Sequence, residues 1–306
     1  MNGVLVVDKP GGWTSHDVVS RVRRVVRAKK AGHGGTLDPL ATGVLPIYLN
    51  EATKLVPFNL EGTKEYVATL RLGQETDTLD ADGEIIAETR KFFLSREAIE
   101  EALKPFRGNI RQRPPAFSAI KKKGVPVYRR ARAGEKPLLE ERAAMIHSLD
   151  LREVAFPLIT IAVTCGRGTY IRSLAADIGR ALGVGAHVSR LRRLRSGLFT
   201  LEQAVTLEEL AIRAERDTIE EKVLLPKDSV ELAAWIQVPP ETAVRIRQGR
   251  PLCLKEMAGS ERGSLSDGQR VGIGAAPRDL VAIAEVRAAE SPGAPPAVRI
   301  LRVFHP

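Results

Sequence analysis

The chain has 306 residues, of which 43% are hydrophobic and 27% charged, a balance typical of globular proteins. This length allows one large domain and one small domain. No stretch approaches 18 consecutive apolar residues, and the N-terminus lacks the basic start and apolar core of a signal peptide. We therefore expect a cytoplasmic protein without a membrane span. Two scattered cysteines, Cys165 and Cys253, predict neither a disulfide framework nor a zinc site, so no bound metal is expected.

Positive charge is concentrated in two places. The formal net charge is +10, which favours a polyanionic partner because binding phosphates releases counterions. Residues 107–142 contain 11 Lys+Arg against 3 Asp+Glu. A second cluster within six residues comprises Arg190, Arg192, Arg193 and Arg195. A charge run is often only a solvated face, but two runs with little acidic compensation indicate a nucleic-acid surface.

The first half of the chain predicts a strand, a helix and a second strand. Val4–Val7 is a short apolar run that indicates a buried strand. Thr14 and Ser15 are good helix caps, and valines then recur at helical spacing and lead into a glycine-rich loop at residue 32. Residues 65–72 alternate as a strand, with Tyr66 on its apolar face, and residues 77–83 form a polar turn.

The second half predicts a basic excursion, a strand followed by a helix, and a separate β-rich region. Ser95 caps a helix, after which residues 111–137 lose periodicity. Residues 158–165 indicate a strand, and a glycine turn then precedes an apolar-periodic helix that ends near Gly183. From about residue 230, short apolar runs alternate with Gly, Ser and Pro, which predicts a small β-rich domain.

Residues 32–43 carry the strongest chemical indication. Four glycines and one proline surround a single carboxylate, Asp38, and such a loop can hold a carboxylate open to a large ligand. The alternative is that Asp38-Pro39 simply begins a turn. A solvated aspartate has a pKa of about 3.9, so Asp38 should be ionised, and a nearby guanidinium would keep it so. We choose Arg172 as that partner, because it opens the helix after the glycine turn.

Cofactor motifs are absent from the sequence. We find no P-loop and no Gly-x-Gly-x-x-Gly, and His33 has no histidine or cysteine at metal-ligand spacing. This leaves a mechanism in which a carboxylate acts without a cofactor.

Several motifs together resemble those of one enzyme family. The string Gly32-His-Gly-Gly-Thr-Leu-Asp38-Pro-Leu-Ala-Thr-Gly43 resembles the catalytic motif of the TruB family of tRNA pseudouridine synthases. The resemblance extends to segments 64–83, 114–132, 168–172, 191–199 and 244–250. It implies an α+β pseudouridine synthase fold, with a mixed, mainly antiparallel central sheet and flanking helices, over residues 1–229. It also implies a basic thumb insertion at about 107–142, and a PUA-like RNA-binding domain over residues 230–306.

The resemblance also assigns roles to residues of this chain. Asp38 corresponds to the catalytic aspartate, Arg172 to its partner, and Tyr66 to an aromatic that stacks on the flipped base. His33 would help occupy the position that the base leaves. Tyr66, or water beside it, would take the C5 proton. The other residues implied to bind substrate or RNA are Gly35, Thr36, Lys64, Tyr170, Lys121, Lys122, Lys123, Arg132, Arg192 and Arg193.

The implied reaction converts the T-loop uridine of tRNA, conventionally numbered 55, to pseudouridine. The base is flipped out first. Asp38 then acts either as a nucleophile on uracil C6 or through a glycal route. No cofactor and no protein partner are implied, and a monomer is expected.

Three other interpretations stay open at this point. One is a guide-RNA-dependent synthase of box H/ACA particles, against which the long basic thumb argues. Another is a non-catalytic tRNA chaperone or RNA-binding protein. Such a protein would not need Asp38, Tyr66 and Arg172 together, so their joint presence argues against it. A third is a carboxylate-pair hydrolase, which needs a second acid such as Asp77 or Asp80 beside Asp38. Loop chemistry explains those two acids better.

Overall fold

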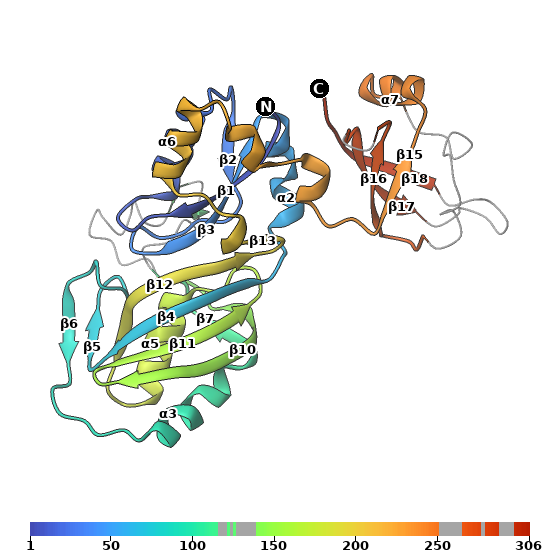
Figure 1. Ribbon diagram of the computed structural model, residues 1–306. Helices are drawn as coiled ribbons and strands as arrows, with labels where there is room; N and C mark the ends of the chain where they lie inside the picture. Colours follow the sequence, from blue (N-terminus) through green and yellow to red (C-terminus); the bar gives the residue numbers. More distant parts are fainter. Residues whose placement is uncertain (116–120, 123–124, 127–138, 251–264, 277–278, 288–296) are drawn as a thin grey trace.

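The computed structural model describes residues 1–115, 121–122, 125–126, 139–250, 265–276, 279–287 and 297–306. Within these ranges, a large α+β domain is followed by a smaller β domain (Figure 1). The predicted fold class and the separate C-terminal β domain are confirmed. Among the described residues, no helix is both long and apolar enough to cross a membrane.

A ten-stranded sheet organises the large domain. Neighbouring strands are antiparallel except β12 and β3, which pair in parallel, so the sheet is mixed and mainly antiparallel as predicted. Its main path runs β14 (Val223–Leu224), β1 (Gly3–Lys9), β3 (Thr42–Leu49), β12 (Ala186–Ser196), β4 (Lys64–Leu72), β11 (Leu158–Cys165), β10 (Arg142–Ala155) and β7 (Gly108–Gln112). Off this path, β13 (Phe199–Thr200) pairs with β12 and β2 (Ala31–His33) pairs with β3.

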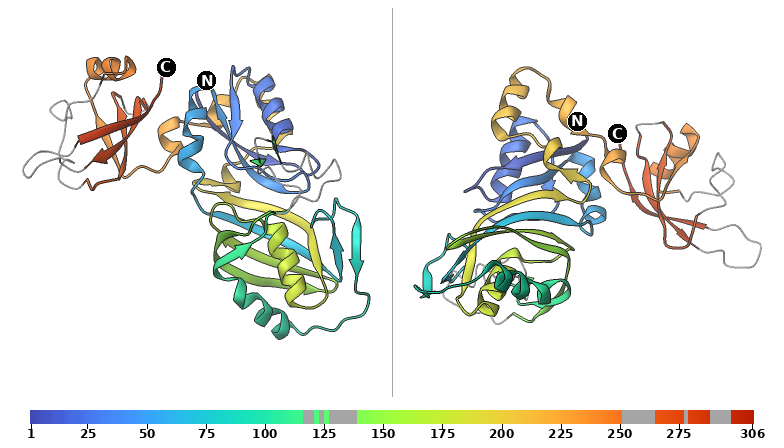
Figure 2. Two further views of the ribbon diagram at one scale, coloured as in Figure 1. Left: turned by 180° about the vertical axis from the view of Figure 1, so that it is seen from behind. Right: turned by 60° about the horizontal axis from the view of Figure 1, so that its bottom comes forward.

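Helices cover the sheet and fix the ends of the functional loops. Helix α1 (Ser15–Val25) begins at a capping box between Thr14 and Asp17, and it packs beside β2 and α6 (Leu207–Glu215). Helix α5 (Ile171–Ala181) packs on β12, and α3 (Arg96–Leu103) packs on β10 at the same end of the domain (Figure 2). The strand β2 separates α1 from the glycine loop, whereas we had expected the helix to lead directly into it.

The remaining described elements are short. A hairpin joins β5 and β6, and another joins β8 and β9. Their bounds are β5 (Gln74–Thr76), β6 (Ile85–Glu88), β8 (Lys121–Lys122), β9 (Val125–Pro126), α2 (Val56–Asn59), η1 (Asn50–Leu55), η2 (Lys104–Phe106), η3 (Leu201–Gln203), η4 (Ile219–Lys222) and η5 (Pro226–Ser229).

The C-terminal domain is a four-stranded sheet with its own apolar core. Its strands run β15 (Ala234–Gln237), β16 (Arg270–Gly274), β17 (Ala282–Arg287) and β18 (Ala297–Val303), accompanied by α7 (Pro240–Arg247). A further apolar cluster joins Val4 and Val6 of β1 to Ile283 and Phe304 of this domain. Because Leu5 and Val7 face the main core instead, β1 is buried on both faces, which explains its unbroken apolar run.

The basic insertion is shorter than predicted. Residues 108–112 form β7, and its last residue, Gln112, pairs with Arg142, the first residue of β10. Residues 107–112 therefore lead into or belong to the central sheet, and the excursion spans only residues 113–141. Arg111 of this strand counts toward the charge of the predicted insertion, because a sheet edge strand can carry charges on its exposed positions. Lys123 and Arg132 lie outside the described residues.

Candidate active site

A cavity of about 260 Å³ lies where the glycine loop, β4 and the start of α5 meet. It brings together segments that are far apart in the sequence. Eight of the predicted site residues line it: Gly35, Thr36, Asp38, Lys64, Tyr66, Tyr170, Arg172 and Arg193. His33 and Arg192 are not part of its lining.

Arg172 holds two carboxylates, one on each side. Its Nη2 donates to Asp38 Oδ1 at 2.9 Å, and its Nη1 lies 3.3 Å from Asp80 Oδ2. Nη1 also donates to the Thr78 carbonyl at 2.9 Å. The side chains of Arg172 and Asp80 are each only 6% exposed, whereas that of Asp38 is 35% exposed, so Asp38 is the group that a ligand in the cavity can reach.

Asp80 is a site residue that the sequence interpretation missed. It had been assigned, with Asp77, to turn chemistry alone. The turn does use it, because Thr78 Oγ1 donates to Asp80 Oδ1 at 2.6 Å. Backbone hydrogen bonds of Leu79 and Ala81 with Val188 of β12 then fix the turn against the sheet and direct the carboxylate at Arg172.

The electrostatics of Asp38 differ from the expectation. Burial raises the pKa of the Asp38 carboxyl above its ordinary value, and the neighbouring Asp80 adds to the rise, while Arg172 opposes both. We had expected the guanidinium to dominate. Arg172 nevertheless favours the ionised form of the Asp38 carboxyl.

The glycine loop is held from below by Arg193. This side chain is 1% exposed, and it donates to the carbonyls of Val44 at 2.8 Å and Gly35 at 3.1 Å. Gly35 has φ +97°, which a residue with a side chain rarely adopts. A Cβ at Gly43 would lie 2.1 Å from the Arg193 carbonyl oxygen. Strand β12 can therefore approach β3 this closely only because residue 43 is a glycine.

The prediction that the four arginines between residues 190 and 195 form one RNA-binding surface is wrong. Residues 186–196 form β12, in which successive side chains point to opposite faces. Arg193 is buried under the catalytic loop, whereas Arg192 forms an ion pair with Asp8 at 2.7 Å and Arg195 one with Glu65 at 2.9 Å. Two of the four cations are thus already neutralised, and Arg193 supports the site from inside.

Tyr66 forms a wall of the cavity, and Lys64 lines it from the same strand. Burial raises the pKa of the Tyr66 phenol, so its hydroxyl is neutral near pH 7. Lys64 Nζ donates to the Leu60 carbonyl at 2.6 Å and to the Gly62 carbonyl. Burial lowers the pKa of His33, which lies in β2 beside this loop and is therefore neutral.

Lys9 is a second residue that the sequence interpretation missed. It is 0% exposed, and its Nζ donates to the carbonyls of Pro10, Trp13 and Pro39 at 2.8, 2.6 and 3.1 Å. One buried ammonium therefore ties the end of β1 to the residue after Asp38. A lysine near the end of a buried strand and directly before a proline was the available indication.

Lys9 predicts an alkaline limit on catalysis. Burial lowers its pKa to about 8, so the ammonium loses a proton, and one of its three donated hydrogen bonds, as the pH rises through 8. We expect kcat/KM, which reports the free enzyme, to fall above that pH. In Lys9→Arg this alkaline decrease in kcat/KM should disappear, because a guanidinium does not lose its proton in that pH range. The measurement is kcat/KM between pH 6 and 9.5, and an unchanged decrease in the variant would exclude Lys9 as its origin.

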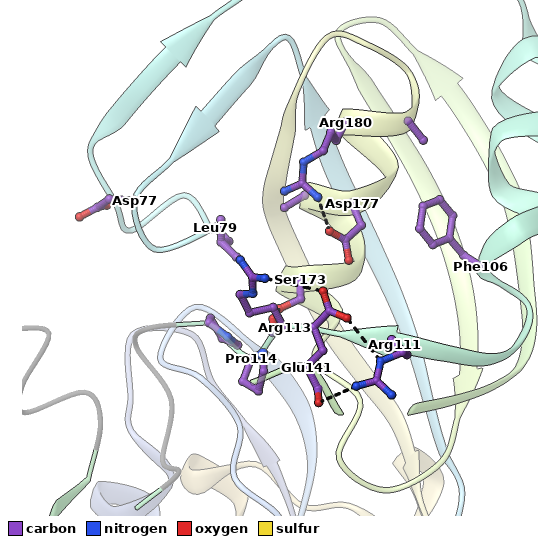
Figure 3. A pocket seen from close by; sticks show the side chains of 13 residues that line it. Asp77, Leu79, Phe106, Arg111, Arg113, Pro114, Glu141, Ser173, Asp177 and Arg180 are labelled. Carbon is purple, nitrogen blue, oxygen red and sulfur yellow. Dashed lines mark hydrogen bonds and ion pairs between the residues drawn. The ribbon is translucent and has the colours of Figure 1, made fainter. Parts of the chain in front are cut away.

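The base of the insertion is connected to the start of α5. The Gln112 carboxamide, 2% exposed, accepts from the Tyr170 N–H at 3.1 Å and donates to the Tyr170 carbonyl at 3.3 Å. Ser173 Oγ donates to the Arg113 carbonyl at 2.7 Å, within a separate cavity of about 690 Å³ that Figure 3 shows. These bonds anchor Tyr170 and Ser173, one on each side of Arg172 in the sequence. Of the three carboxylates labelled in Figure 3, Asp177 pairs with Arg180 and Glu141 lies near Arg113, while Asp77 lies apart from both.

Gln112→Glu is expected to slow catalysis about tenfold, because it replaces the donor that faces the Tyr170 carbonyl by an acceptor and so loosens the backbone before Arg172. The single-turnover rate at saturating RNA measures this. Asn59→Asp is a matched control, since it removes an amide that donates to the Ser229 carbonyl at 2.7 Å and to the Tyr48 hydroxyl at 3.0 Å, and Asn59 does not itself line the cavity. Equal losses of rate in both variants would show a general loss of stability instead.

A carboxylate held by a buried arginine, beside a cavity with a tyrosine wall, fits the site that the resemblance implies. Two family models match consecutive parts of the chain: the TruB family pseudouridylate synthase N-terminal domain over residues 23–171, and the tRNA pseudouridylate synthase B C-terminal domain over residues 172–244. The chain belongs to the TruB family of pseudouridine synthases, and it is an isomerase.

Relatives and solved structures agree with this assignment. The chain is 46% identical to a tRNA pseudouridine synthase B of Syntrophus aciditrophicus, over 100% of this chain and 99% of the relative. It is 41% identical to one of Geobacter sulfurreducens, over 100% of both. A solved chain from the archaeal box H/ACA sRNP Nop10–Cbf5 complex is similar with a TM-score of 0.73 and 30% identity, over 100% of this chain and 86% of that chain.

Proposed function

We propose that this chain isomerises the T-loop uridine of tRNA, conventionally numbered 55, to pseudouridine, and that it acts in the cytoplasm where that substrate is found. The observation that carries the proposal is the placement of Asp38: it is the exposed member of the buried Asp38–Arg172–Asp80 network, and it faces a cavity that Tyr66 closes on one side. A flipped uracil stacked on Tyr66 would present its glycosidic bond to this carboxylate.

The reaction requires no external group. The bond from uracil N1 to ribose C1′ breaks, the base rotates, and C5 bonds to C1′. The C5 proton then leaves, and N1 gains one. Asp38 starts the sequence, either by attack on C6 or by assisting glycosidic cleavage. Because the Tyr66 phenol is neutral, it is a weak base, and we assign it the stacking contact and the ordering of the water that accepts the C5 proton.

We further propose two RNA-binding regions outside the cavity. The basic insertion with Lys121, Lys122, Lys123 and Arg132 would grip the stem-loop, and the four-stranded C-terminal domain would act as a PUA domain. The monomer needs no protein partner for this activity. Both regions predict that affinity depends steeply on salt.

A guide-RNA-dependent activity is the second candidate, because the similar solved structures come from box H/ACA complexes. Their identity of 30% is lower than the 41–46% shared with tRNA pseudouridine synthases B over the full chain. The higher identity to the tRNA pseudouridine synthases B supports an enzyme that selects its substrate without a guide RNA.

The test is pseudouridine formation in an unmodified tRNA transcript and in its isolated T stem-loop, with no guide RNA, nucleotide or metal added. The expected result is stoichiometric conversion of one T-loop uridine, the one numbered 55, in both. A protein that binds the RNA yet modifies it only after addition of a guide RNA would establish the second candidate.

A further inference from the structure

Helix α1 and the turn after it carry a second concentration of positive charge, distinct from the insertion. Residues 18–37 contain no Asp or Glu. Six cations lie between residues 21 and 30, and all six are exposed. Within the described part of the chain, none of the six takes part in an ion pair of 4.0 Å or less. We call this set the α1 basic face: Arg21, Arg23, Arg24, Arg27, Lys29 and Lys30.

Stability of the helix does not account for these charges. Cations in the last helical turn offset the helix dipole, and Arg23 and Arg24 can do so. Arg27 directly follows the C-cap and can share in that effect, whereas Lys29 and Lys30 lie further beyond the helix end, where it falls off. The helix already has its capping box at the other end and buries Val18 and Val22 in the core.

Arg27 occupies a backbone position that favours glycine. It has φ +52°, directly after the C-cap residue Val26. The Ala28 N–H bonds to the Arg23 carbonyl at 3.0 Å and the Arg27 N–H to the Arg24 carbonyl at 3.3 Å, which is the glycine-type end of a helix. An L-residue with a side chain is strained in this conformation. The chain thus retains a cation where the fold would be better served by glycine, which is the pattern of a functional position.

The α1 basic face is fixed relative to the catalytic loop. Ser15 Oγ, in the first turn of α1, accepts from the Leu37 N–H at 2.9 Å and donates to the Leu37 carbonyl at 3.0 Å. Leu37 directly precedes Asp38, so a phosphate bound to α1 lies at a set distance from the carboxylate. None of the residues that line the active cavity comes from α1, so the helix contacts a different part of the ligand.

A groove runs beside this face, between α1 and α6. Arg21, Arg24 and the 39% exposed Trp13 line it, together with two acids, Asp17 and Glu208. Asp17 is already engaged by the capping box with Thr14. In Figure 2 α1 lies at the outside of the large domain, and its exposed side faces solvent. Guanidinium groups next to an exposed aromatic ring are the combination that binds a nucleic-acid backbone and its bases.

We propose that the α1 basic face binds the phosphate backbone of the tRNA substrate and thereby sets the position of the RNA relative to Asp38. The proposal rests on tRNA being the substrate. It adds a surface that is separate from both the insertion and the C-terminal domain. Arg27 is its most specific member, because its charge is kept against a conformational preference.

Arg27→Gly separates binding from folding. Glycine relaxes the backbone strain and removes the charge, so we expect a melting temperature equal to or above that of the wild type together with a several-fold higher Kd for tRNA. A merely structural role for Arg27 predicts no change in affinity. Unchanged affinity in this variant therefore overturns the role of Arg27.

The whole face is tested by the variant Arg21→Gln/Arg24→Gln/Arg27→Gly. Each lost phosphate contact lowers the slope of log Kd against log salt by about 0.9 for a duplex, so we expect a slope smaller by about two to three and a Kd raised at least tenfold. Binding is measured apart from modification, so an inactive wild type would refute the proposed function without deciding this point.

A charge-matched control uses Lys91→Gln/Arg152→Gln/Arg216→Gln, three exposed cations on other parts of the large domain. It should leave the Kd within twofold and the slope unchanged. An equal loss of affinity in the control, or a slope in the α1 variant within 0.5 of the wild type, would refute a specific phosphate-binding surface.

Discussion

Replacing Asp38 by Asn is expected to lower the single-turnover rate of pseudouridine formation by at least about four orders of magnitude, because groups that act directly on the reacting bond carry losses of that size. Asparagine has the same shape, and its amide oxygen can still accept the hydrogen bond that Arg172 donates to Asp38 Oδ1 at 2.9 Å. It lacks the negative charge for either route of the reaction. Asp80 remains beside Arg172, so the buried guanidinium keeps a carboxylate partner.

Binding should survive in this variant. Asp38 contributes a single, partly exposed carboxylate to a site that also contains Tyr66 and several cations, and removal of a negative charge does not oppose a polyanion. We expect the Kd for tRNA to change by less than about threefold. A filter-binding or fluorescence titration beside the rate measurement gives both numbers. A loss of affinity as large as the loss of rate would mean that Asp38 is structural.

Asp8→Asn is the matched control for the chemistry. Asp8 is also an aspartate paired with an arginine of the central sheet, at 2.7 Å from Arg192, and it has the same change of carboxylate to amide. It does not line the cavity. Its rate should stay within a few-fold of the wild type, which ties the effect at Asp38 to its position rather than to a lost ion pair.

Sequence patterns correctly predicted those helices and strands that depend mainly on neighbouring residues. The capping residues Thr14 and Ser95 begin helices, and the apolar alternation in residues 158–165 gives a strand. Asp38 and Arg172 could be paired because the glycine-rich motif and the helix after Gly168 are each recognisable by themselves. Their contact at 2.9 Å joins residues that are 134 positions apart in the sequence, which no local pattern can establish.

What the sequence did not predict depends on long-range pairing. Lys9 and Gln112 act through backbone carbonyls or N–H groups that the sheet brings to them, and no local pattern marks such partners. The arginines at 192 and 193 were misread for another reason. Their segment was not recognised as a strand, and a period of two assigns neighbours to opposite faces. Charge density along a sequence is therefore a poor guide to a surface when the segment is extended.

The position of Asp80 suggests why the network contains two carboxylates. Arg172 alone would favour the ionised form of Asp38 strongly and would also bind the carboxylate so firmly that its reactivity falls. A second, buried carboxylate shares the guanidinium and adds a negative charge that raises the pKa of Asp38. We propose that Asp38 is thereby held in place while it retains basicity and nucleophilicity.

Asp80→Asn is accordingly expected to slow the single-turnover rate about 10- to 100-fold, the usual effect of losing a group that orients a reacting one. The amide can keep the hydrogen bond from Thr78 Oγ1, so the turn should persist. Affinity for tRNA should stay within about threefold, because Asp80 is only 4% exposed.

The pH dependence of the same variant separates this role from simple destabilisation. Asp80 raises the pKa of Asp38, so its neutralisation lowers that pKa, and the acidic limb of the rate profile should move to lower pH even though the maximum rate falls. Asp77→Asn lies in the same turn, but Asp77 is exposed and its Oδ1 accepts from the Glu84 N–H, so this variant should change neither the rate nor the acidic limb. A variant at Asp80 that lost rate with an unmoved acidic limb would show that Asp80 only supports the turn, and the shared-guanidinium explanation would have to be abandoned.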